Sequence, residues 1–151
     1  PKTSSPFEMQ RYLSKISGPL LDRIDIHIEV NPVPFEKLSE EQLSEPSTEI
    51  RKRVTKAREI QTQRFTEYGN VHHNAHMNVK QIRKYCKLLP ECSILLKNAM
   101  ERLSLSARAY DRILKVARTI ADLAESEDIG IEHLAEAIHF RSLDRENWAG
   151  N

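Results

Sequence analysis

The chain has 151 residues, of which 39% are hydrophobic and 30% charged, and its formal net charge is +1. This length suffices for one substantial core, or for one domain with part of another. The composition is that of a soluble globular protein, no apolar run is long enough to span a bilayer, and the balanced charge does not demand a nucleic acid as partner.

Targeting signals are absent from the first residues, PKTSSPFEMQ, which show neither an initiator Met nor the basic and then apolar pattern of a signal peptide. Cys86 and Cys92 lie in helical patterns, and they form neither a CxxC pair nor a disulfide framework. We therefore expect a cytoplasmic, reducing location, and a chain that is a piece of a longer polypeptide.

The amino-terminal part contains one sharp strand signal. PFEMQRYLSKI indicates a helix, and Gly18 with Pro19 restarts the chain. From Ile24 to Val30, Ile and Val alternate with charged residues and His, as in a strand with one buried face. A lone strand cannot satisfy its own backbone groups, so this strand should belong to a sheet mostly absent from the chain.

A proline-rich connector follows the strand. NPVPFEKLSEEQLSEPS has the composition of a linker rather than of a core. We place the domain boundary there, with residues 1–34 before the linker, residues 35–46 as the linker, residues 47–145 as a helical domain and residues 146–151 as a tail.

The helical domain should contain four or five helices with recognisable beginnings. Ser47 or Thr48 can cap the first, and Asn78 with Gln81 resembles a capping box. Pro90 suits a first helical position, and Ser106 is the expected N-cap of the longest helix.

Apolar spacing predicts the inner face of each helix. The expected faces are Ile50, Val54, Ala57 and Ile60; Ile82, Tyr85 and Cys86; Ile94, Leu95, Ala99 and Leu103; Tyr110, Ile113, Leu114, Ala117, Ile120, Ala121 and Ala124; and, after Gly130, Ile131, Leu134, Ala135 and Ile138. We also expect Leu105 and Tyr110 to form a hydrophobic staple.

Several kinds of site are excluded. The chain has no GxxxxGK[ST] phosphate loop, no Gly-x-Ser-x-Gly elbow and no His-Glu-x-x-His motif. His72, His73 and His76 are close in sequence but have no nearby Cys or carboxylate partner, so we expect a polar loop and no metal site.

A basic run occupies the first predicted helix. Its five cations within eight residues are Arg51, Lys52, Arg53, Lys56 and Arg58. Such a run is either a solvated helix face or a surface for nucleic acid, and both interpretations remain open.

Two arginines occupy unusual positions. Arg108 falls in the first turn after the cap, where the helix dipole disfavours a cation, so it either pairs with a carboxylate such as Asp111 or forms an anion site fit for phosphate. Arg23 falls at the entrance of the predicted strand, where it either pairs with Asp22 or Asp25 or is presented rigidly to a neighbour's phosphate.

These residues resemble a known family. SGPLLDRIDIHIEV, the proline-rich connector, LSARAYDRILKVARTIADL and IEHLAEAIHFRSLDR are similar to the magnesium-chelatase-like AAA+ ATPases of the bacterial ComM (YifB) competence-protein type. The resemblance extends from about Arg11 to Arg145.

The resemblance implies a mainly α fold, a helical-bundle AAA+ lid preceded by the last helix and strand of an α/β P-loop ATPase core. It implies an arginine finger at Arg23, acting in trans, and a sensor-2 arginine at Arg108 that reaches the γ-phosphate of ATP. ATP with Mg²⁺ would bind the parent protein, and no cofactor is expected in the isolated fragment, which should be inactive because Walker A and Walker B are missing.

Partners are implied as well. They are the chain's own N-terminal ATPase core, neighbouring subunits of a homo-oligomeric ring, expected to be a hexamer, and DNA as the substrate of branch migration; no membrane is expected. The alternative is a helical module that binds DNA or protein and has no nucleotide role.

Overall fold

The computed structural model describes residues 11, 20, 23–28, 30, 32 and 45–141. Range 45–141 contains the helices α4 (Ser47–Arg64), α5 (Val79–Tyr85), α6 (Pro90–Arg102), α7 (Ala107–Leu123) and α8 (Ile131–His139), and the 3-10 helix η1 (Asn74–His76). The expectation of a mainly helical fold is confirmed, and the arrangement is consistent with a helical lid domain.

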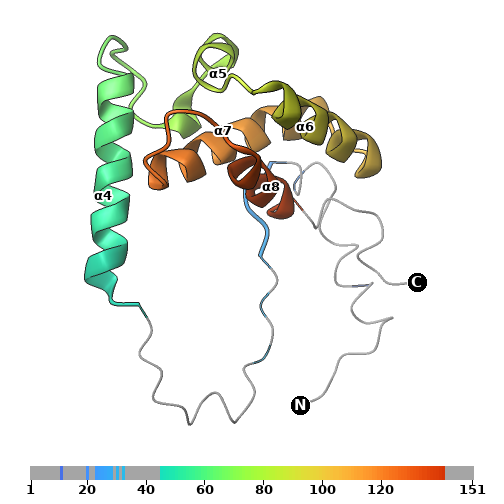
Figure 1. The fold of residues 1–151 in the computed structure, drawn as a ribbon, viewed down its shortest axis with the longest axis horizontal. Coiled ribbons are helices and arrows are strands. Elements are labelled where there is room, and N and C mark those ends of the chain that lie inside the picture. Colours follow the sequence, from blue (N-terminus) through green and yellow to red (C-terminus); the bar gives the residue numbers. More distant parts are fainter. Residues whose placement is uncertain are drawn as a thin grey trace.

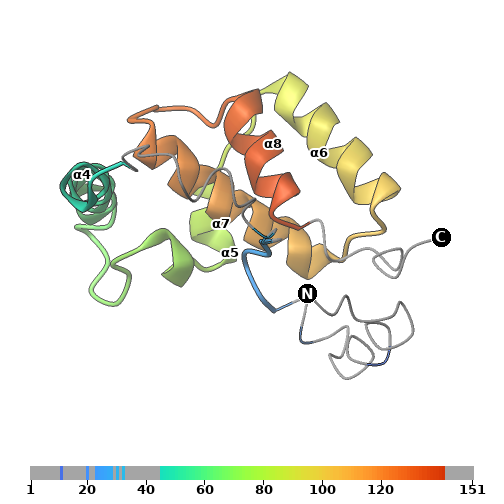
Figure 2. The same ribbon diagram turned by 90° about the horizontal axis from the view of Figure 1, so that it is seen from below.

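Helix α7 lies in the middle of the helical domain (Figure 1) and contacts α4, η1, α5 and α8. Helix α6 packs against α8, and the view from below shows these two helices side by side (Figure 2). The buried side of α7 includes Ala109, Ala117 and Ala121, each fully inaccessible to solvent. Such small side chains let neighbouring backbones approach closely, while each buried Ile or Leu beside them contributes roughly 1.5–3 kcal/mol.

Three helix beginnings agree with the sequence predictions. The Asn78 side chain accepts a hydrogen bond from the backbone N–H of Gln81, and the Gln81 side chain accepts one from the backbone N–H of Asn78. The two bonds complete the capping box. Pro90 is the first residue of α6, and Ser106 caps α7. The prediction for α4 was wrong, because its N-cap is Pro46 and neither Ser47 nor Thr48.

The predicted inner faces are correct in part. Tyr110 of α7 and Ala124, which follows the helix as its C-cap, are exposed, whereas Arg118 and Asp122 are buried. Helix α6 buries Cys92 and Leu96 instead of Ile94. In α8 the buried residues are His133, Leu134 and Ala137, while Ile131 and Ala135 are exposed. The buried faces of α7 and α8 differ from the predicted ones because each helix packs against more than one neighbour. Helix α7 contacts α4, η1, α5 and α8, and α8 contacts α6 and α7.

The first half of α4 extends beyond the other helices (Figure 1). All residues from 45 to 56 are exposed, including Ile50 and Val54, which were predicted to face a core. Burial begins at Ala57 and Gln61, where α4 reaches α7. Only the second half of α4 is therefore anchored to α7 in the part of the chain that the structure describes.

The predicted strand is not formed in residues 23–28, 30 and 32, the portion of this region that the structure describes. Ile28 is 66% and Val30 87% exposed, whereas His27, on the opposite side of the alternation, is buried. Without neighbouring strands the alternating pattern has no ladder to join. The helix predicted at PFEMQRYLSKI lies almost entirely outside the described residues.

Candidate functional site

Arg23 begins a short segment, residues 23–28, that lies against the helical domain. The Arg23 amide donates a hydrogen bond of 3.0 Å to the Leu20 carbonyl, and its side chain is exposed. Two further contacts hold the segment to the end of α8. The His27 amide donates to the Phe140 carbonyl at 2.8 Å, and the guanidinium of Arg141 donates to the Ile24 carbonyl.

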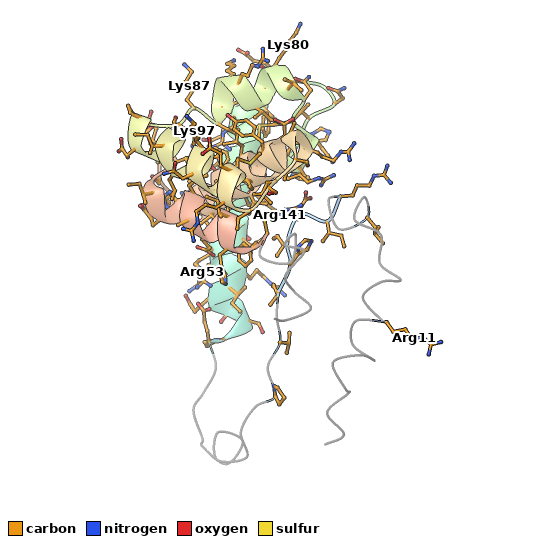
Figure 3. The ribbon with its side chains drawn as sticks, turned by 90° about the vertical axis from the view of Figure 1, so that its right-hand side faces the viewer. Arg11, Arg53, Lys80, Lys87, Lys97 and Arg141 are labelled. Carbon is orange, nitrogen blue, oxygen red and sulfur yellow. The ribbon has the colours of Figure 1, made fainter. Side chains whose placement is uncertain are left out.

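Arg141 is the anchor of this junction. It is fully buried, although it is the second residue after α8, and Figure 3 shows it where the helices meet the 23–28 segment. A buried guanidinium needs hydrogen-bond acceptors, and the Ile24 carbonyl supplies one.

Asp25 makes the contact from this segment to α7. Its carboxylate forms an ion pair with Arg112, across 87 residues of sequence. Asp25 was one of two carboxylates considered as a partner for Arg23, and the structure shows it paired with Arg112. The other, Asp22, lies outside the described residues.

Arg108 lies in the first turn of α7, as the sequence predicted. Ser106 Oγ accepts a hydrogen bond of 3.1 Å from the Ala109 amide, which satisfies one of the free N–H groups at this helix end. Arg108 is exposed, while its neighbour Ala109 is fully buried and fixes the start of the helix.

Arg108 and Arg112 are four residues apart on α7 and therefore share one face of the helix. Because Asp25 binds Arg112, the segment that carries Arg23 is tied to the face of α7 that carries Arg108. Thus one region of the structure contains both predicted site arginines. Arg112 was missed from the sequence, although its spacing from Arg108 was a usable signal.

A buried polar cluster fixes the opposite end of α7. Asp122, 1% exposed, accepts hydrogen bonds from Arg64 of α4, Asn74 of η1 and Arg118. Arg118 also donates to the carbonyls of Ser126 and Glu127, at 2.6 and 2.7 Å. The cluster therefore connects α4, η1, α7 and the loop before α8.

The electrostatics of this cluster reflect its burial. Burial lowers the pKa of Arg118, and the adjacent Asp122 carboxylate opposes that shift. The position of the cluster, at the α4 end of α7 and away from Arg108, indicates a structural role.

The basic run lies on the exposed part of α4. Lys52 pairs with Glu49 at 2.8 Å, and Arg53, labelled in Figure 3, pairs with Glu45 through both oxygens. The Arg53 guanidinium hydrogen-bonds the Glu45 carboxyl and lowers its pKa. Two of the five cations are thus engaged with carboxylates, and the remaining three are exposed: Arg51, Lys56 and Arg58.

The three loop histidines lie close together, with ring centroids 5.3 to 6.5 Å apart. Within the described residues, no group of His, Cys, Asp and Glu side chains could hold a metal ion. Nor is any helix in that part of the chain long and apolar enough to cross a membrane.

A hollow of about 770 Å³ between α5, α6 and the start of α7 was not predicted. Ile82, Cys86 and Leu114 form its apolar floor, and Arg83 and Lys87 also line it. Of these two cations, Lys87 is labelled in Figure 3. No periodic pattern in the sequence predicts the hollow, because it depends on how three helices pack.

Comparison with known proteins identifies relatives across nearly the whole chain. Residues 44–141 match the family described as magnesium chelatase, subunit ChlI C-terminal, and residues 2–38 match magnesium chelatase, subunit ChlI. Competence protein ComM of Haemophilus influenzae is 44% identical over 143 residues, or 94% of this chain, and uncharacterized protein YifB of Escherichia coli is 40% identical over 142 residues, or 93% of this chain.

Uncharacterized protein Rv2897c of Mycobacterium tuberculosis is 36% identical over 132 residues, which is 87% of this chain and 26% of that relative. The chain spans 27% of the length of the ComM and YifB relatives. The two family matches follow one another along the sequence, and the helical domain corresponds to the C-terminal part of the family. The chain therefore belongs to the magnesium chelatase subunit ChlI family.

Proposed function

We propose that this chain is the C-terminal part of a magnesium-chelatase-like AAA+ ATPase, in which Arg23 and Arg108 act on ATP. Residues 1–34 would complete the ATPase core, residues 35–46 would link it to the lid of residues 47–145, and residues 146–151 would form a tail. The observation that carries the proposal is the Asp25–Arg112 ion pair, because it ties the Arg23 segment to the face of α7 that bears Arg108.

The chemistry of both positions suits a phosphate. Arg108 belongs to the first turn of a long helix, where backbone N–H groups and the helix dipole favour an anion. A guanidinium beside such a helix end can bind phosphate oxygens through two parallel hydrogen bonds. ATP with Mg²⁺, held by the N-terminal core, would supply the transferable γ-phosphoryl group.

Arg23 would serve as an arginine finger for the ATP of a neighbouring subunit, and Arg108 as the sensor-2 residue at the γ-phosphate. This division of roles requires a homo-oligomeric ring, for which we propose a hexamer in the cytoplasm. Relatives include a competence protein, so we further propose that the ring remodels DNA by branch migration.

The proposal is tested by Arg23→Ala and Arg108→Ala in the full-length protein. We expect each variant to lose roughly 10³-fold in kcat for ATP hydrolysis, the lower end of the effect of an arginine finger. Arg102→Ala, at an exposed position on α6, is the matched control and should keep normal turnover. Normal turnover in both site variants would contradict the proposal.

The trans action of Arg23 has its own test. Subunits with Arg23→Ala are mixed with subunits defective in Walker A, neither of which hydrolyses ATP alone. Activity should return in the mixture, because an intact finger then faces an intact nucleotide site. A mixture that stays inactive, in rings shown to exchange subunits, would contradict action in trans.

A further inference from the structure

The 23–28 segment is held by three contacts, one from α7 and two from the residues that directly follow α8. Asp25 pairs with Arg112 of α7, the Ile24 carbonyl accepts from Arg141, and the His27 amide donates to the Phe140 carbonyl at 2.8 Å. Two of these contacts use backbone groups of the segment, which any residue could provide. The third depends on side-chain charge at one position of the segment.

Asp25 is close enough to Arg23 to control its position. Two residues of fully extended chain span at most about 7 Å, so fixing the Asp25 backbone confines Arg23 to that radius. The turn that joins Arg23 to Leu20 restricts the segment further.

On α7, Arg112 is well placed to bind the segment close to Arg108. It lies one turn, about 6 Å, along α7 from Arg108. Two like charges at this spacing repel each other, and the Asp25 carboxylate offsets the charge of Arg112. The side chain of Arg112 is 27% exposed and that of Asp25 49%, so the guanidinium is partly shielded from solvent and the carboxylate is about half exposed.

We propose that Asp25 and Arg112 are positioning residues that hold Arg23 in register with Arg108, so that both guanidinium groups move together when the helical domain moves. The inference rests on the proposed function and adds to it a physical connection between the two site arginines. Without the pair, each arginine remains present, but their relative placement is no longer fixed.

The first readout is the kinetics of the full-length ATPase. We expect Asp25→Asn and Arg112→Gln each to lower kcat about tenfold, because a misplacement of about 1 Å can cost up to about 10²-fold, while KM for ATP changes less than about twofold. The conservative changes Asp25→Glu and Arg112→Lys should retain most of the rate. Asp128→Asn and Arg102→Gln, exposed residues outside the junction, are the matched controls.

The second readout places the effect on Arg23. In an Arg23→Ala background, Asp25→Asn should cause no further loss, because a positioning residue acts through the group that it positions. An equal loss in both backgrounds would overturn the inference, as would normal kcat in Asp25→Asn and Arg112→Gln.

A third readout is independent of activity. Hydrogen exchange of the His27 amide should become roughly tenfold faster in Asp25→Asn and Arg112→Gln, because the segment opens locally, and stay slow in Arg23→Ala. Unchanged exchange in the first two variants would overturn the inference. If Arg23→Ala and Arg108→Ala both keep full turnover, the proposed function fails, and the exchange rates still show whether the pair holds the segment.

Discussion

Asp122 is the residue on which the buried polar cluster depends. Arg64 and Arg118 both donate to its carboxylate, and Asn74 donates to it at 2.8 Å. The carboxylate is completely shielded from solvent, and Arg64 is only 13% exposed. Two cations around one carboxylate are tolerated because the Ser126 and Glu127 carbonyls accept the remaining Arg118 donors.

We predict that Asp122→Asn lowers the free energy of unfolding by about 3–5 kcal/mol, the usual cost of leaving a buried charge without its partner. Urea denaturation of the purified chain measures this change. Asp128→Asn, at an exposed site, should change stability by no more than about 0.5 kcal/mol. A similarly small change in Asp122→Asn would show that the cluster does not support the fold.

Cys86 gives a prediction about pH. Burial raises the pKa of its thiol from 9.0 to about 12, so the folded protein keeps the thiol neutral where the unfolded chain ionises it. Its contribution is therefore fully present below pH 9 and is lost between pH 9 and about 12. The unfolding free energy should fall more steeply over this range in the wild type than in Cys86→Ala; parallel curves would contradict the shift.

Among the elements, helix α7 has a buried apolar side and a first turn with polar and charged side chains. Its first turn carries Arg108, and the Ser106 hydroxyl organises the N–H groups beside it. A weaker cap would let this turn fray and move Arg108 away from a fixed position.

We predict that Ser106→Ala destabilises the chain by about 1 kcal/mol, which is typical for loss of an N-cap side chain. Ser106→Thr keeps a capping hydroxyl and should cost much less. Thermal unfolding of both variants makes the comparison. Equal melting temperatures for the wild type and Ser106→Ala would mean that the hydrogen bond to Ala109 contributes nothing.

The elements also show what a sequence can predict. The capping box at Asn78 and the cap at Ser106 were correct because capping depends on residues three positions apart. The strand from Ile24 was wrong for the described residues, because a strand depends on partners elsewhere. Arg118 and Asp122 were missed because charged residues are usually exposed, and their burial depends on Arg64, 58 residues before Asp122 in the sequence.

The candidate site, too, could be predicted from the sequence only in part. Arg108 became a candidate because of its position in a capped first turn, and Arg23 because of its position before an alternating pattern; their roles stay predictions. Their association through Arg112 and Asp25 was not identifiable, because it depends on how the 23–28 segment packs against α7.

At the scale of the whole molecule, the face of α7 with Arg108 and the exposed first half of α4 are two separate surfaces (Figure 1). The face of α7 with Arg108 lies next to the 23–28 segment, whereas the first half of α4 extends away from the other helices (Figure 1). That half carries Arg51, Lys52 and Arg53 of the basic run, and Lys56 and Arg58 follow it along the helix. Lys52 and Arg53 are paired with glutamates. If the full-length protein binds DNA through α4, the three remaining cations should therefore contribute most.

We predict that replacing Arg51, Lys56 and Arg58 by Gln weakens DNA binding by the full-length protein and flattens its salt dependence. Each cation on a phosphate contributes about 0.9 to the slope of log K against log salt for duplex DNA, so the slope should decrease by roughly 2 to 3. Fluorescence anisotropy with a labelled duplex across a salt series measures this slope. Lys52→Gln with Arg53→Gln is the matched control, and it should change the slope less because these cations already face Glu49 and Glu45. An unchanged slope in the triple variant would exclude α4 as the surface that contacts the DNA backbone.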